Sequence, residues 1–146
     1  QAMAASPQAR GLRVLSVLLG VFFLFEGISK IGWLTDPSLL TARLTGFLQN
    51  ATAWNRGYLE TVCIPWAPLF ARLVLLGELA TGASLITGVW ARYAAAVAFL
   101  MVMNIHFASG LLFQYGFLTN GYGFPVVGGL LALAIGAVGR PLSLKR

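Results

Sequence analysis

Cysteine, histidine and acidic side chains are scarce in this chain. Its 146 residues include one cysteine, Cys63, one histidine, His106, and four aspartates and glutamates in total. A lone cysteine excludes an internal disulfide and a Cys-x-x-Cys redox pair. A single histidine without a second histidine or cysteine nearby offers too few ligands for a metal site. We therefore expect neither thiol exchange by this chain alone nor a bound metal ion.

The short motifs that mark common enzyme classes are also absent from the sequence. It has no glycine-rich phosphate loop, no nucleophile elbow and no zinc-protease helix motif. Ten basic and four acidic residues give a net charge of +6, but the basic residues stand mainly beside the ends of apolar segments and form no continuous basic stripe. They are typical of membrane topology signals, and we expect no nucleic-acid partner. Whether the chain catalyses a reaction is left open.

Apolar residues are what the chain has in abundance. Hydrophobic residues make up 58% of it and charged residues 10%, and the mean hydropathy is +0.81. This composition excludes a soluble domain with an ordinary surface and predicts an all-α membrane protein. Four apolar segments predict a bundle of four transmembrane helices in a single domain over residues 1–146. The expected spans are residues 14–31, 69–90, 93–113 and 124–138.

The long segment 32–68 between the first two spans is no ordinary linker. Its apolar residues recur at helical spacing, which predicts a short amphipathic helix at the membrane interface with Arg43 pointing elsewhere. Those residues are Leu40, Leu44, Phe47 and Leu48. Large aromatic residues in the same outer loop fit an interfacial belt or a docking surface for a partner chain. They are Trp33, Trp54, Tyr58 and Trp66.

Basic residues flank the predicted spans unevenly. Six of the ten lie on one side, at Arg10, Arg13, Arg92, Arg140, Lys145 and Arg146. On the opposite side lies the segment 32–68, in which acidic residues offset the basic ones. The positive-inside rule therefore predicts that both termini are cytoplasmic.

Six polar or ionisable side chains interrupt the apolar segments. They are Glu26, Lys30, Arg72, Glu78, Asn104 and His106. An ionisable group in hydrocarbon costs ~2.5 to 3.5 kcal/mol on insertion scales, so such groups are expected to be paired, to face a cavity or to be used in function. With a rise of ~1.5 Å per residue, all six fall in the outer half of the membrane. They are our candidate ligand-binding cluster.

This cluster has a structural and a functional interpretation. Glu26 and Lys30 have the i,i+4 spacing of an intrahelical pair. Pairing of Arg72 with Glu26, or of Lys30 with Glu78, would fasten helices together. Alternatively, the cluster lines a polar pocket open to the outer leaflet, where cationic or imidazole donors hydrogen-bond the carbonyl oxygens of a quinone-like molecule and His106 passes a proton. No other cofactor is evident.

Two sequence motifs resemble the DoxX family. The first, RVLSVLLGVFFLFEGISKIG, contains Arg13, Gly20, Phe23, Gly27 and Lys30, and the second, LGELATGASLITGVWARYAA, contains Glu78, Gly82, Gly88 and Arg92. Proteins of this family are small four-helix bacterial membrane proteins, named for a relative that is a subunit of a thiosulfate:quinone oxidoreductase. The resemblance implies a multi-pass protein of the bacterial inner membrane that is associated with redox chemistry, and it highlights Lys30 and Glu78.

Three functions are compatible with these observations. The first is a DoxX-like subunit of a redox or electron-transfer complex that binds quinone or lipid through the outer cluster. The second is a non-catalytic structural accessory subunit of a larger respiratory or photosynthetic complex, with the aromatic loop docking other membrane-protein subunits. The third, a small transporter or lipid-handling protein, is less expected because four spans show no inverted repeat.

Overall fold

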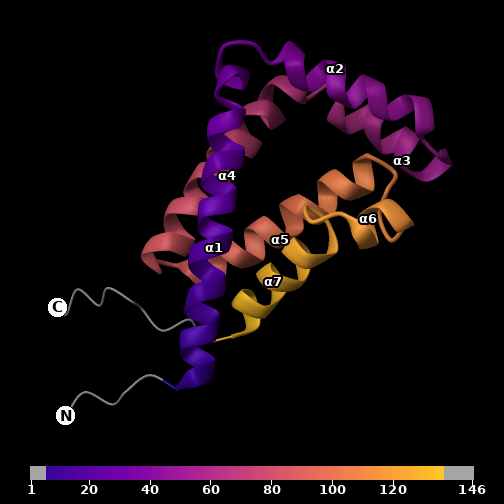
Figure 1. Ribbon diagram of the computed structural model, residues 1–146. Coiled ribbons are helices and arrows are strands. Elements are labelled where there is room, and N and C mark those ends of the chain that lie inside the picture. Colours follow the sequence, from indigo (N-terminus) through magenta and orange to yellow (C-terminus); the bar gives the residue numbers. More distant parts are fainter. Residues whose placement is uncertain (1–5, 137–146) are drawn as a thin grey trace.

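The regular secondary structure of the protein is helical throughout the part that the computed structural model describes, residues 6–136. The longer helices are α1 (Pro7–Ser29), α4 (Ala67–Thr87), α5 (Ala91–Ala108) and α7 (Phe124–Ile135) (Figure 1). The first three are long and apolar enough to cross a membrane. α7 is a shorter apolar helix of 12 residues, about 18 Å long. The chain is therefore a small helical membrane protein.

Several helix boundaries differ from the expected spans. α1 begins at Pro7 rather than near residue 14, because Ser6 caps it by accepting a hydrogen bond from the Ala9 amide and proline suits a first helical turn. α5 ends at Ala108 rather than near residue 113. The left-handed backbone at Gly110 and Phe113 turns the chain there. The predicted end of the fourth span at residue 138 lies outside the described residues.

Short helices fill the connections. They are α2 (Ser38–Phe47), α3 (Ala53–Tyr58) and α6 (Tyr115–Thr119), with 3₁₀ turns at Ile31–Leu34 and Leu48–Asn50 and a π turn at Leu59–Cys63. α2 is the expected amphipathic helix, since its Leu40 and Leu44 are buried. α6 was not expected, because its five residues are too few to show a helical period.

α1 and α4 cross with their backbones almost in contact. A Cβ atom added at Gly82 would lie 2.7 Å from the Leu24 amide nitrogen and 2.9 Å from the Gly20 carbonyl oxygen. A Cβ atom at Gly20 would meet the Ile86 side chain at 2.7 Å. Small residues allow such an approach in membranes, where no hydrophobic effect drives helices together. Both sequence motifs therefore meet at this crossing.

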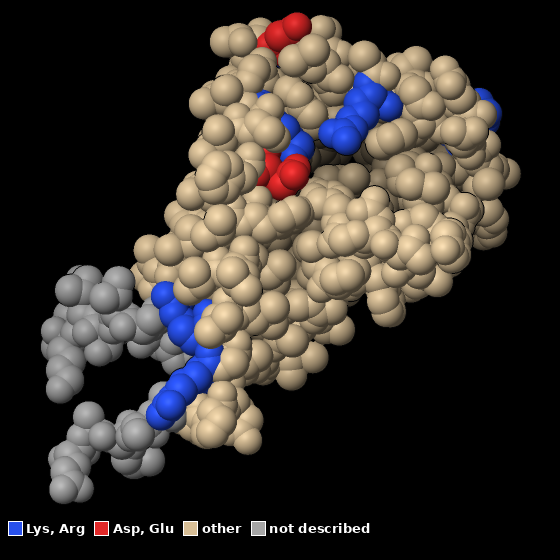
Figure 2. Space-filling model, in the orientation of Figure 1, with Lys and Arg blue, Asp and Glu red and all other residues tan. Residues whose placement is uncertain are grey.

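Arginines stabilise the end of the bundle at which α1 begins. Arg13 donates hydrogen bonds to the carbonyl oxygens of Leu85 (3.3 Å) and Ile86 (2.5 Å), near the carboxyl end of α4. Arg92 donates to the Ala134 carbonyl oxygen on α7 at 2.8 Å. These bonds satisfy carbonyl groups that have no partner within their own helix. Basic side chains gather at this end of the surface (Figure 2).

The helices separate toward the other end of the bundle. There α5 leans away from α1 and α4, and α2 and α3 extend over the space between them (Figure 1). Large hydrophobic side chains point outward from α1 at helical spacing, at Val14, Leu18, Val21, Phe25 and Ile28. Such an apolar stripe is the surface that a spanning helix presents to lipid.

Gly82→Ala should lower the stability of the protein, because the added methyl group meets backbone atoms of α1 that cannot move without separating the helices. Overpacking of this kind costs about 1–3 kcal/mol. Reversible unfolding in bicelles measures the effect. Gly128→Ala is the matched control, since nothing among the described residues lies within 4 Å of its Cβ position and its stability should be unchanged or slightly raised. Equal stability of the two variants would contradict the close crossing.

Candidate functional site

A pocket of about 450 Å³ lies where α5 separates from α1 and α4. Its lining is mostly apolar, with side chains from α1, α2, α4 and α5 such as Phe22, Leu44, Phe70 and Ile105. The surface is hollowed here, and the hollow opens across the side of α1 rather than beyond its end (Figure 2). Volume and lining are those of a small-molecule site, and the lateral opening faces the direction from which a membrane-dissolved molecule would arrive.

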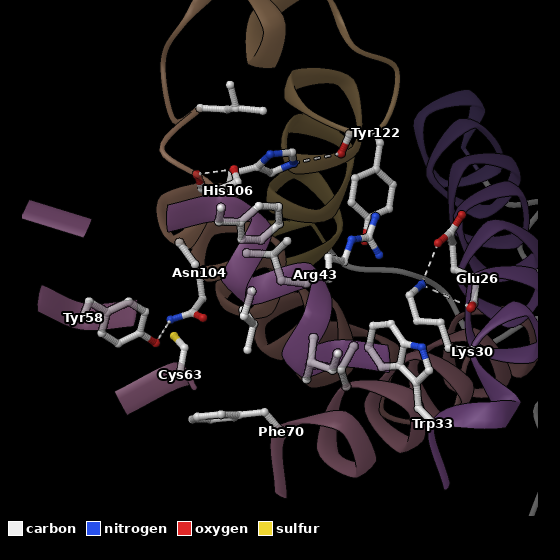
Figure 3. A pocket seen from close by; sticks show the side chains of 18 of the residues that line it. Glu26, Lys30, Trp33, Arg43, Tyr58, Cys63, Phe70, Asn104, His106 and Tyr122 are labelled. Atoms are coloured by element: carbon white, nitrogen blue, oxygen red, sulfur yellow. Dashed lines mark hydrogen bonds and ion pairs between the residues drawn. The ribbon is translucent and has the colours of Figure 1, made fainter. Parts of the chain in front are cut away.

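Lys30 lies between two carboxylates at one wall of the pocket. Its Nζ atom is 2.7 Å from Glu26 Oε2 on the same helix. Across the helix crossing it is 3.1 Å from Glu78 Oε1 and 3.0 Å from Glu78 Oε2. Both pairings that the sequence offered to Lys30 are therefore present (Figure 3 draws the Glu26 pair). The cross-helix pairing joins the last turn of α1 to the middle of α4.

Lys30, Glu26 and Glu78 form a charged triad, and burial differs sharply between its two carboxylates. Glu78 is 0% exposed, whereas the Glu26 side chain is 35% exposed and lines the pocket. Glu78 Oε2 lies beside the ammonium group but accepts no hydrogen bond of good geometry from the described residues. The Trp33 ring centroid, 5.9 Å from Nζ, adds a cation–π contact. Lys30 is thus the group that compensates a fully buried carboxylate.

Polar groups of α5 form the opposite wall. Asn104 donates a hydrogen bond to the Tyr58 hydroxyl at 2.6 Å. His106 Nε2 lies 3.4 Å from the Tyr122 carbonyl oxygen, an acceptor that requires the proton on Nε2. The His106 ring also packs edge-on against Phe117, with ring centroids 4.8 Å apart. Asn104 and His106 both line the pocket, with Asn104 pointing toward Tyr58 and the His106 ring toward Tyr122 (Figure 3).

Arg72 does not join this cluster. Its guanidinium donates to the carbonyl oxygens of Pro68 (2.9 Å) and Leu34 (3.4 Å), and it neither lines the pocket nor pairs with Glu26. The aromatic residues of the first loop also divide into two groups. Trp33 and Tyr58 line the pocket, whereas Trp54 and Trp66 lie on the surface, 86% and 58% exposed.

Three titratable residues of the lining belong neither to the predicted cluster nor to the predicted docking residues: Arg43, Cys63 and Tyr122. Arg43 was assigned to another face of its helix, although it is three residues from Leu40, a spacing that shares a face. Tyr122 lies in the glycine-rich loop before α7, where the sequence suggests a lipid or pigment contact but gives no periodicity that would place it beside the cluster. Burial raises the pKa of the Tyr122 phenol, Glu78 and Glu26 raise it further, and Arg43 opposes them.

Cys63 is a buried thiol beside Tyr58. Burial raises the pKa of the Cys63 thiol, and a hydrogen bond with Tyr58 partly lowers it. Burial likewise raises the pKa of the Tyr58 phenol, which the hydrogen bond from Asn104 lowers in part. Both groups are thus neutral hydrogen-bonding partners at ordinary pH. Within residues 6–136, no three histidine, cysteine or acidic side chains gather as metal ligands.

The chain matches the model of a known protein family. The family model described as DoxX matches residues 11–110, a range that includes both sequence motifs, α1 from its fifth residue onward, and the helices α2 to α5. All six polar residues of the candidate cluster lie within it. No curated protein and no solved structure matches the chain.

Lys30→Met should destabilise the protein strongly, because it leaves Glu78 buried without its cation. Removing one partner of a buried ion pair costs about 3–5 kcal/mol. The double variant Lys30→Met/Glu78→Gln should recover part of the loss, since the buried charge is then gone. A double-mutant cycle on unfolding free energies in bicelles measures the coupling. Arg72→Gln serves as control with little change, and additive effects at Lys30 and Glu78 would refute the pairing.

Proposed function

Because this chain belongs to the DoxX family, we propose that it binds a quinone-type molecule in the lateral pocket, as a membrane subunit of a redox or electron-transfer complex. The observation that carries this proposal is that one mostly apolar pocket brings together hydrogen-bonding groups from two walls. Glu26 stands on α1 and Lys30 caps its carboxyl end, and Asn104 and His106 stand on α5. Four of the six residues of the predicted cluster thus line the same pocket.

The arrangement suits the chemistry of a quinone. A quinone ring is a flat apolar body with carbonyl oxygens at opposite ends, so it needs apolar walls and donors on two sides. On one side the pocket holds the Lys30 ammonium, whose three N–H groups are bound to Glu26 and Glu78, and the Glu26 carboxylate. On the other side it offers the second N–H of the Asn104 amide and His106 Nδ1, which accepts a hydrogen bond from a quinol hydroxyl. His106, with its proton on Nε2, and the pocket-exposed Glu26 are the groups suited to exchange protons with the ligand.

The proposed orientation follows from charge. The arginines Arg10, Arg13 and Arg92 stand at the end where α1 and α5 begin, away from the pocket. We assign this end to the cytoplasm of a bacterial cell and the pocket to the outer leaflet. Trp54→Cys checks the assignment: a membrane-impermeant thiol reagent added outside the cells should label this exposed position, and labelling only after lysis would reverse it.

An accessory role is the second candidate, and the exposed tryptophans favour it. Trp54 and Trp66 present large aromatic surfaces at the pocket end of the bundle, where a partner subunit could dock. Replacing both with alanine should release partner chains that copurify with the native protein in mild detergent. If the same partner chains still copurify, the two tryptophans do not dock a partner and instead anchor the protein in the lipid headgroup layer.

Binding of a radiolabelled short-chain benzoquinone to the protein in nanodiscs tests the quinone proposal. We expect saturable binding at one site per chain. His106→Phe, which keeps a ring of similar size but removes the hydrogen-bonding nitrogens, should weaken binding about three- to tenfold, the scale of one hydrogen bond. Arg72→Gln, outside the pocket, should bind as the native protein does. Uptake that does not saturate, or equals that of empty nanodiscs, would refute the proposal.

A further inference from the structure

Arg43 differs in its contacts from four other arginines of the described residues. Four arginines donate to carbonyl oxygens or pair with a carboxylate: Arg13, Arg56, Arg72 and Arg92. Arg43 makes no hydrogen bond and no ion pair with any residue in the described range 6–136. A guanidinium group carries five N–H donors in a rigid fork, so here these donors are available to a ligand.

The position of Arg43 directs its N–H donors into the pocket. It stands on α2, the amphipathic helix over the pocket, between Leu40 and Leu44, which also line it. Its side chain reaches into the space between the α1 wall and Tyr122 (Figure 3). Its charge acts on Glu78 and on the Tyr122 phenol, so it lies within the same electrostatic environment as the buried triad. Arg43 is therefore part of the pocket rather than of the outer surface of the loop.

The charges around the pocket indicate which ligands it accepts. Lys30 and Arg43 carry two positive charges, and Glu26 and Glu78 carry two negative ones, so the ionised set sums to zero. Lys30 is already shared between two carboxylates. An anionic ligand would leave net negative charge in a low-dielectric site, and a cationic ligand would leave net positive charge. The balance favours an uncharged molecule.

We infer that Arg43 is a ligand-binding residue of this pocket and that its guanidinium donates to an oxygen acceptor of an uncharged amphiphile. The inference rests on the proposed function, in that the pocket must hold a membrane-dissolved molecule. Quinones and neutral glycerolipids such as diacylglycerol both present carbonyl oxygens on an apolar body. The shared chemistry is thus a neutral headgroup with carbonyl acceptors, and the experiment separates the two sources.

Equilibrium binding to the full chain in nanodiscs tests the inference with three radiolabelled probes: a short-chain benzoquinone, dioctanoylglycerol and oleate. Arg43→Gln should weaken binding of the preferred neutral probe about tenfold or more, the scale of a hydrogen bond to a charged group. Arg43→Lys should restore part of the loss, because it keeps the charge but not the fork. Arg56→Gln, in the same outer loop but outside the pocket, should stay within about twofold of the native protein.

The outcomes separate this inference from the proposed function. Saturable quinone binding that Arg43→Gln leaves unchanged overturns the role of Arg43 while the quinone proposal stands. Binding of dioctanoylglycerol without quinone, weakened by Arg43→Gln, supports Arg43 and the uncharged class and overturns the quinone assignment. If oleate binds more tightly than both neutral probes, the inference that the pocket prefers an uncharged ligand is wrong. Failure of all three probes to bind the native protein overturns both proposals.

Discussion

The close crossing of α1 and α4 is the constraint on which the rest of the structure depends. Gly20 and Gly82 let the two backbones meet, and a Cβ atom at Gly27 would lie 2.8 Å from the Leu79 side chain, so the contact continues along α1. With the helices this near, Lys30 reaches the fully buried Glu78. A wider crossing would leave that carboxylate in an apolar interior without the ammonium group beside it, which is strongly unfavourable.

The pocket follows from how α5 is attached to this pair. A tight turn with left-handed backbone at Gly88 and Trp90 joins α4 to α5 at one end of the bundle, and α7 packs along α5. α5 is thereby held close at that end and diverges at the other, where α2 covers the space that remains (Figure 1). A rigid helix pair and a diverging third helix produce a cavity with a lateral opening.

The glycines and arginines that carry the family resemblance do not line the pocket. Gly20, Gly82 and Arg13 build the helix crossing and its end, and Gly88 ends α4 in the left-handed conformation that glycine tolerates. The pocket is completed by α2 and by the loop before α7, which supplies Tyr122 beyond the matched range 11–110. The helix crossing therefore lies wholly within the matched range, whereas part of the pocket lining lies beyond it.

The sequence by itself determined the membrane class, the long apolar helices and the amphipathic α2, because hydropathy and period are local properties of the chain. It also placed Glu26, Lys30, Glu78, Asn104 and His106 at one depth, since helix rise converts position into height. Which of them meet was decided only by the tertiary structure, because depth does not fix the rotation of a helix. Packing turned Arg72 outward, brought Arg43 and Tyr122 to the pocket, and gave Lys30 both of its carboxylates.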